Sequence, residues 1–265
     1  MSALKSGLSV APSMSEGDTT VSSGFYAAFS GWLARSEALD SAASNLANAG
    51  TEGFRAEREY FRSALMGPGA SGDQLDSTIN NFGVLGGNRL DLGQGPLTAT
   101  GNPLDVAIEG QGFFAIQTKN GIRYTRDGSF QRTRAGLLVT SQGEPILDVK
   151  NRPIHIPTGH IVIGSDGVIS VDGAVSGTLG VFTFPSATSI APEGANRYVP
   201  VNGAKPKISA SASLHQGSLE GSNQDVIQGT LDLILAQRQA EMMQKALVLF
   251  DNDLDKTASE QLPKV

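Results

Sequence analysis

The sequence lacks cysteine altogether. This absence excludes disulfide bridges, thiolate metal sites and cysteine nucleophiles. The chain also has no apolar run of about 18 residues, the length that a membrane-spanning helix needs. Near its amino terminus no continuous apolar segment precedes a small-residue cleavage site, so a Sec-type signal peptide is not predicted.

Charge is scarce as well. Asp, Glu, Lys and Arg together make up 17% of the 265 residues, and the net charge is −6. A surface that binds nucleic acid by its phosphates needs clustered Lys and Arg, which this composition does not provide. We therefore expect no nucleic-acid partner.

The motifs of common enzymes and metal sites are missing too. The three histidines, His155, His160 and His215, lie outside any HExxH pattern, so no metal site is predicted. There is no Gly-x-Ser-x-Gly elbow, no Gly-Lys-Ser/Thr phosphate loop and no EF-hand ligand series. We expect no catalytic residue, no cofactor and no small-molecule substrate. A pair of carboxylates that meet only in space stays an open alternative.

Glycine, by contrast, is abundant, with 32 residues. Because glycine adopts positive φ without steric cost, this number predicts many tight turns. From about Thr98 onward, short β-forming runs alternate with Gly and Asp turns. One example is Val168–Val171 between two Asp-Gly pairs, which predicts a hairpin. The middle of the chain is therefore expected to form a mostly antiparallel β domain.

Both ends of the chain carry apolar residues at alternating steps of three and four, which place them on one side of an α-helix. The first series is Phe25, Phe29, Trp32, Ser36, Leu39, Ala43 and Leu46, and the second is Val226, Gly229, Leu233, Ala236, Ala240, Met243, Leu247, Phe250 and Leu254. We expect the first helix to end at Asn48-Ala49-Gly50 and the second to be capped by Ser222 or Asn223.

These patterns together predict an α+β fold. The terminal helices are expected to pair as an axial coiled-coil-like bundle, beside a central, mostly antiparallel β domain. The spacing leaves open whether the helices pair within one chain or between chains. The predicted parts are a disordered extension at 1–22, a discontinuous axial helical domain at 23–66 and 212–258, a connecting loop at 67–97, the β domain at 98–211 and a tail at 259–265.

Three separated motifs resemble bacterial flagellar axial proteins, the family of rod, hook and hook-associated proteins. Residues 44–54 are similar to the signature A-N-N-[LI]-A-N-x-x-T-x-G-[FY], with Ser44 in place of an Asn. Residues 101–117 and 124–147 look like the family's β domain. The segment 217–223 and the later Q-R-x-[YF]-E-M pattern, with Ala240 at the aromatic position, are similar to its closing helix. The matching residues are Asn45, Leu46, Ala47, Asn48, Thr51, Gly53, Phe54, Gln237, Arg238, Glu241 and Met242.

The resemblance implies a structural subunit of a tubular rod that crosses the periplasm and transmits motor torque to the hook. The implied partners are copies of itself, other rod proteins and the flagellar type III export apparatus, with no membrane insertion. The short connection between Phe54 and Thr98 resembles the proximal-rod branch of the family, and the distal-rod branch is the alternative. A peptidoglycan-acting enzyme and a secreted adhesin with coiled-coil ends are the competing classes.

The resemblance also implies roles for single residues. Asn45 and Asn48 are expected to satisfy backbone or inter-subunit hydrogen bonds where the first helix ends. Gly53 is expected to permit a tight turn, and Phe54 to anchor the segment that follows. The apolar residues expected to face each other in the axial core are Phe25, Phe29, Trp32, Leu39 and Leu46 on the first helix, and Leu233, Met243, Leu247 and Phe250 on the second.

Overall fold

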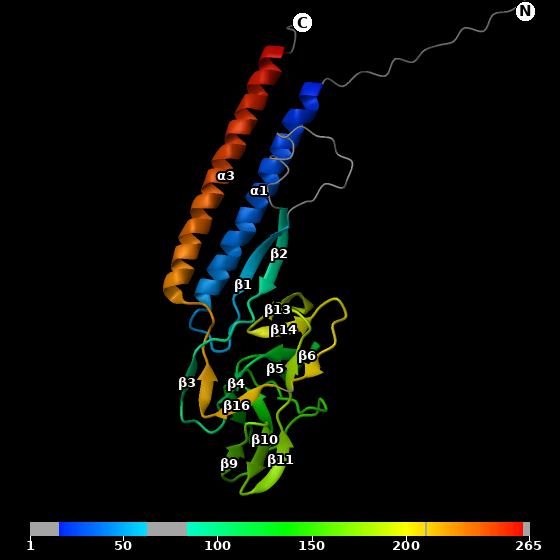
Figure 1. The fold of residues 1–265 in the computed structure, drawn as a ribbon, viewed down its shortest axis with the longest axis vertical. Helices are drawn as coiled ribbons and strands as arrows, with labels where there is room; N and C mark the ends of the chain where they lie inside the picture. The colour runs from blue at the N-terminus through cyan, green and yellow to red at the C-terminus, as the bar shows by residue number, and fades with distance from the viewer. Residues whose placement is uncertain (1–15, 63–83, 210, 262–265) are drawn as a thin grey trace, which may run out of the picture. The chain divides into compact units, whose positions relative to one another are not determined.

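The computed structural model describes residues 16–62, 84–209 and 211–261 (Figure 1). Of residues 16–28, 59–62, 84–87 and 250–261 only the backbone is described. Parts of the predicted extension at 1–22, connecting loop at 67–97 and tail at 259–265 therefore lie outside the described residues.

Two long α-helices lie near the ends of the chain: α1 spans Glu16–Ala47 and α3 spans Val226–Gln261 (Figure 1). α1 ends directly before Asn48, whose backbone N–H still donates to the carbonyl of Ser44 at 3.1 Å. Within the described ranges, no helix combines the length and the apolar character of a membrane span.

The rest of the described chain consists of short strands and turns, with one 3-10 helix, η1, at Ala187–Ser189. The strands are β1 Glu57–Arg62, β2 Val84–Leu90, β3 Leu97–Ala99, β4 Val106–Glu109, β5 Phe113–Thr118, β6 Gly121–Thr125, β7 Phe130–Arg132, β8 Leu138–Thr140, β9 Ile161–Ile163, β10 Val168–Val171, β11 Ala174–Thr178, β12 Val181–Thr183, β13 Ile190–Gly194, β14 Arg197–Pro200, β15 Lys207–Ile208, β16 Ser213–Gln216 and β17 Ser218–Glu220.

The largest sheet has the strand order β13-β14-β6-β5-β12-β15, and its strand pairs are antiparallel. A second sheet has the order β11-β10-β9. Its hairpin is the one predicted after Val171, with Asp172 at φ 50° and Gly173 at φ 85°. Two central turn residues with positive φ match the right-handed twist of the strands that they join.

Strand β5 is buried on both faces, which explains why its sequence shows no polar alternation. Phe114 and Ile116 belong to one apolar cluster, while Phe113 and Ala115 belong to another. Successive side chains of a strand point to opposite faces of the sheet. In the first cluster the ring of Phe114 packs edge-on against that of Phe130, with the centroids 5.0 Å apart. Burying each such side chain stabilises the fold by roughly 1.5–3 kcal/mol before conformational entropy is subtracted.

The described chain divides into two compact units. Of the described residues, one unit contains 16–37, 84 and 237–261, and the other contains 38–62, 85–209 and 211–236. The second unit therefore includes the last turns of α1, the first turns of α3 and nearly all of the strands. β16 and β17 pair with β4 and β3, so the chain that enters α3 is part of this unit.

The prediction of an α+β fold built on a paired coiled-coil-like bundle is wrong. The described residues form a mostly β structure with two α-helices, and no continuous seam of large apolar side chains is buried along them. Of the helix residues whose side chains are described, those that are buried are Ala34, Ala38, Ser41 and Asn45 on α1, and Gly229 and Ala236 on α3. Exposed large apolar residues are Phe29 and Leu33 on α1, and Val226, Ile227, Leu231, Ile234, Leu235, Met242, Val248 and Leu249 on α3.

The reason for this error lies in the contacts between the helices. A coiled-coil seam needs large side chains that insert between those of the facing helix. Here one side of the contact is glycine: a β-carbon on Gly31 would lie 2.5 Å from Cε of Met243, and one on Gly229 would lie 3.4 Å from Cδ1 of Leu46. The 3-4 spacing indicates that one side of a helix is apolar and packs against another surface. It does not specify which segment or subunit provides that surface.

Candidate functional site

Three separated stretches of sequence meet near the end of α1, all within the second compact unit. They are the turn from α1 to β1, the residue after β6, and the segment from β17 to the start of α3. We call this meeting place the junction. It consists of Asn45, Gly53, Arg55, Arg126, Glu220 and Asn223.

Asn45 joins the last turn of α1 to the first residue of β1. Its Nδ2 donates to the carbonyl oxygen of Glu57 at 2.8 Å, and the backbone N–H of Glu57 donates to its Oδ1 at 2.8 Å. The buried amide thus replaces the two hydrogen bonds of a β-bridge. An asparagine side chain carries both the donor and the acceptor that this pairing needs.

Asn48 and Thr51 organise the turn that follows the helix. Nδ2 of Asn48 donates to the carbonyl oxygen of Ser44 at 2.9 Å, and Oγ1 of Thr51 donates to Oδ1 of Asn48 at 3.1 Å. These bonds satisfy polar groups that a helix end leaves unpaired. Both residues are bonded within this chain.

Gly53 lies where the turn touches the backbone after β6. Its φ is +65°, a region that residues with a β-carbon rarely adopt. A β-carbon at this position would lie 2.4 Å from the carbonyl carbon of Arg126. The N–H of Gly53 donates to the carbonyl oxygen of Glu220 at 2.7 Å. Conformation and close packing therefore both require glycine here.

The centre of the junction is a buried ionic group. Nη2 of Arg55 donates to Oε1 of Glu220 at 2.7 Å, and Nε of Arg126 donates to Oε2 of the same carboxylate at 2.5 Å. All three residues are 2% exposed. Charge-assisted hydrogen bonds of this kind are strong, but they must offset the loss of hydration of three charges.

The remaining donors of Arg126 bind backbone carbonyls. Its Nη1 donates to Gly112, and its Nη2 donates to Ile108 at 2.8 Å and to Gly110 at 2.7 Å. Burial lowers the pKa of Arg126, the attraction of Glu220 opposes this effect, and the repulsion of Arg55 adds to it. The two guanidinium groups are close enough to repel each other, and Glu220 holds them together.

Asn223 connects the chain that enters α3 with two other segments. Its Oδ1 accepts from the N–H of Ala56 at 2.7 Å, and its Nδ2 donates to the carbonyls of Asp91 at 2.9 Å and Gly93 at 3.0 Å. The prediction that Ser222 or Asn223 caps α3 is wrong. Asp225 is the cap, because its Oδ1 accepts from the N–H of Gln228 at 2.9 Å.

Tyr198 of β14 adds a further link. Its hydroxyl accepts from the N–H of Arg55 at 3.0 Å and donates to Oδ1 of Asn196 at 3.2 Å. Nδ2 of Asn196 in turn donates to the carbonyl oxygen of Glu52 at 2.6 Å. Burial raises the pKa of Tyr198 to about 12, so the phenol stays neutral and keeps donating its hydrogen bond.

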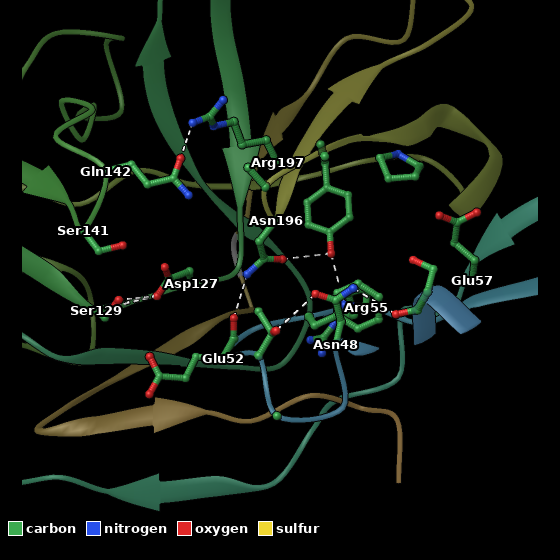
Figure 2. A pocket seen from close by; sticks show the side chains of 18 residues that line it. Asn48, Glu52, Arg55, Glu57, Asp127, Ser129, Ser141, Gln142, Asn196 and Arg197 are labelled. Carbon is green, nitrogen blue, oxygen red and sulfur yellow. Dashed lines mark hydrogen bonds between the residues drawn. The ribbon is translucent and has the colours of Figure 1, made fainter. Parts of the chain in front are cut away.

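Beside the junction opens a groove of about 710 Å³ (Figure 2). Its walls come from the turn after α1, from the β13–β14 hairpin, and from Ser141 and Gln142. Figure 2 shows two separate hydrogen bonds in this wall: Asn196 donates to the backbone carbonyl of Glu52, and Asn48 accepts from Thr51. Burial raises the pKa of Glu52, and the charges of Asp127 and Asp105 raise it further. Among the described residues, no group of three His, Cys, Asp or Glu is placed to hold a metal ion.

The residues expected to assemble the helices differ in how exposed their side chains are. Phe29 is exposed, while Trp32, Leu39, Leu46, Leu233, Met243 and Leu247 are half-buried. The side chains of Phe25 and Phe250 lie outside the described part of the chain. The motif residues Gln237, Arg238, Glu241 and Met242 are exposed on α3, and Ala47 is exposed at the end of α1.

Sequence reasoning missed Arg55, Arg126 and Glu220. A signal for them was present, because each is a charged residue inside or next to a Gly-rich stretch that matched the family. Arg55 follows Phe54, Arg126 precedes Asp127-Gly128, and Glu220 precedes Gly221. Nothing in the spacing indicated that these charges meet in the folded chain.

Comparison with known proteins gives a consistent result. The family model described as "Flagellar hook protein FlgE/F/G D1 domain" matches residues 107–171. The chain is 36% identical over 231 residues to the flagellar basal-body rod protein FlgF of Caulobacter vibrioides, which covers 86% of this chain and 92% of the relative. It is 32% identical over 236 residues to FlgF of Rhizobium meliloti, covering 88% and 95%. It is 31% identical over 254 residues to FlgG of Bacillus subtilis, covering 86% and 95%.

Proposed function

This chain belongs to the family of flagellar basal-body rod proteins, and we propose that its exposed helix faces contact neighbouring subunits and that its junction transmits torque. The resemblance drawn from the sequence motifs is thereby confirmed. The chain is a structural, FlgF-like subunit of the rod, located in the basal body of the flagellum, and it assembles with other rod and hook proteins.

The exposed apolar side chains of α3 support an assembly role for this helix. Ile227 is 75% exposed and Leu249 is 67% exposed, and further large apolar residues lie exposed between them. Apolar faces of this kind mark surfaces that a partner covers. Covering each large side chain stabilises an assembly by roughly 1.5–3 kcal/mol before the cost of ordering. In this proposal the neighbouring subunits of the rod pack against α1 and α3 and bury their exposed apolar side chains.

The junction supports a second part of the proposal, the transmission of torque. A subunit of a rotating shaft must pass a twisting force from its helices to its β strands without turning at the connection. Asn45, Gly53 and Asn223 tie the end of α1, β1 and the start of α3 to one another by short hydrogen bonds. Because these bonds hold the same turn at several points, rotation about the turn breaks several of them together.

The remaining points of the proposal rest on family membership. We propose that the chain leaves the cytoplasm through the flagellar type III export apparatus and is placed in the periplasmic part of the rod. A strain that lacks the export apparatus is then expected to retain the chain in its cytoplasm. Equal amounts of the chain outside the cytoplasm in both strains contradict this point.

We also propose that the chain has no enzymatic activity. The relatives are named as rod proteins, which disfavours the peptidoglycan-acting enzyme and the adhesin. The distal-rod alternative is not favoured either. Zymography of the purified chain on peptidoglycan is expected to show no clearing.

The assembly role is tested by replacing an exposed apolar residue of α3. Leu249→Asp puts a charge on the exposed face without disturbing a buried contact, so the purified chain stays folded. Rod incorporation and swimming are expected to be lost. Gln244→Asp, which adds the same charge at an exposed polar position of the same helix, is the matched control. Normal swimming of the Leu249→Asp strain shows that this face is not an assembly surface.

A further inference from the structure

The buried ionic group of the junction contains more positive than negative charge. Two guanidinium groups, those of Arg55 and Arg126, surround the single carboxylate of Glu220, and all three side chains are shielded from water. The nearby phenol of Tyr198 is neutral, since burial raises its pKa to about 12. The group therefore carries one uncompensated positive charge.

The two arginines differ in how well they are satisfied. The donors of Arg126 reach Glu220 and three backbone carbonyls, whose dipoles offset its charge. Nη1 of Arg55 is buried and has no hydrogen-bond partner among the described atoms. An unpaired buried donor on a charged group is costly, and more so than a neutral one. The positive charge left over in the group thus belongs to Arg55.

A small cavity lies beside both arginines. Its volume is about 20 Å³, and a single water needs at least about 10–15 Å³. Besides the two arginines, the lining residues are Leu92, Gln111, Gly112, Phe113, Thr183 and Phe184. None of the described residues that line it carries a carboxylate. The cavity has room for one small ion or molecule beside the two arginines, with both apolar residues and the polar Gln111 and Thr183 around it.

We propose that this cavity binds one monovalent anion of the size of chloride, which accepts a hydrogen bond from Nη1 of Arg55. An anion neutralises the excess charge and satisfies the unpaired donor at once. A water molecule satisfies the donor alone and leaves the charge. The apolar part of the lining, Leu92, Phe113 and Phe184, favours a weakly hydrated halide over fluoride, and the volume excludes sulfate and organic anions.

Such a site links the stability of the junction to the halide concentration. A ligand that binds only the folded chain raises the folding equilibrium constant in proportion to its concentration, once this exceeds the dissociation constant. In that range, tenfold more chloride raises the equilibrium constant by about tenfold. Gluconate at the same ionic strength gives no such rise, because it cannot enter the cavity.

The first experiment is urea unfolding of the full chain in sodium chloride and in sodium gluconate at equal ionic strength. Chloride is expected to raise the unfolding midpoint. Arg55→Met removes the excess charge and leaves Arg126 paired with Glu220, so the difference between the two salts is expected to disappear. Arg58→Met, at a half-exposed arginine paired with Asp91 at 3.4 Å, is the matched control and is expected to keep it.

Equal midpoints of the unaltered chain in both salts overturn the proposal and assign the cavity to water. The same holds if Arg55→Met keeps the chloride effect. A second measurement does not depend on how the variants fold. In crystals of the full chain grown with sodium bromide, an anomalous peak is expected within hydrogen-bond distance of Nη1 of Arg55. A cavity without this peak contradicts the site.

Discussion

Gly53 and Arg126 touch through their backbones, with no room for a side chain between them: a β-carbon on Gly53 would lie 2.4 Å from the carbonyl carbon and 2.5 Å from the carbonyl oxygen of Arg126. The contact joins the turn after α1 to the residue that follows β6. It also brings the N–H of Gly53 to the carbonyl of Glu220. One glycine thus sets the distance between the three segments of the junction.

Gly53→Ala is expected to destabilise the chain for two reasons. The positive φ of 65° costs a residue with a β-carbon roughly 1–2 kcal/mol, and the contact with Arg126 forces the backbone apart. We expect a loss of at least about 2 kcal/mol in the free energy of unfolding, measured by urea denaturation.

Gly50→Ala in the same turn is the control for this prediction. A β-carbon on Gly50 meets no atom within 4 Å, so its effect is expected to stay within about 0.5 kcal/mol. Equal effects of the two substitutions contradict the packing argument at Gly53.

Asn45→Asp replaces the side-chain nitrogen that donates to the carbonyl oxygen of Glu57 with a carboxylate oxygen. The carboxylate still accepts from the N–H of Glu57, but it no longer donates to the carbonyl oxygen, which is then left facing a negative charge. The expected loss is about 1–3 kcal/mol. Hydrogen exchange at the backbone amide of Glu57, which donates to Asn45, is expected to speed up.

Asn48→Asp is the matched control for this substitution, because the hydrogen bond of Asn48 to Ser44 is exposed. Water replaces an exposed bond at little cost, so a smaller effect is expected. If both variants lose the same stability, the buried pairing of Asn45 has no special role.

The extent to which these features follow from the sequence differs from element to element. The hairpin at Asp172-Gly173 was predicted correctly, since its turn chemistry is local. The end of α1 before Asn48-Ala49-Gly50 was also predictable from the residues that stop helices. The pairing of the helices was not, because an apolar stripe does not identify the surface that covers it.

The contacts of the junction could not be predicted from the sequence. Arg55 and Glu220 are 165 positions apart, and no local rule relates them. Their pairing depends on how β17 pairs with β3 and on how the turn after α1 returns to the strands. The cap of α3 was missed for a smaller reason: Ser222, Asn223 and Asp225 are all good caps, and Asn223 is engaged elsewhere.

Glu220→Gln removes the only negative charge from the buried ionic group and leaves two guanidinium groups to repel each other. Breaking a buried ion pair from one side costs about 3–5 kcal/mol. We expect a loss of this size in the free energy of unfolding, and a larger response to chloride than in the unaltered chain.

Glu193→Gln is the control for this prediction, since Glu193 pairs with Arg123 at 2.5 Å while 33% of its own side chain stays exposed, against 1% for Glu220. Exposed pairs contribute little because water and salt screen them, so a far smaller loss is expected. A Glu220→Gln variant as stable as Glu193→Gln contradicts the view that burial makes the junction charges important.

Because the phenol of Tyr198 is buried, we expect the free energy of unfolding to fall in alkaline solution. Burial raises the pKa of its phenol from the usual 10.0 to about 12 in the folded chain. The folded state therefore favours the neutral form, and its advantage is complete below pH 10. As the pH rises from about 10 to about 12, the unfolded chain loses its proton first and stability falls. A shift of this size corresponds to about 3 kcal/mol.

Tyr198→Phe separates this effect from the titration of other groups. The variant has no phenol to ionise, so its stability is expected to fall less between pH 10 and pH 12, although it starts lower because the N–H of Arg55 loses its acceptor. The measurement is urea unfolding at several alkaline pH values for both chains. Because the argument concerns the slope and not the starting stability, parallel pH profiles of the two chains contradict it.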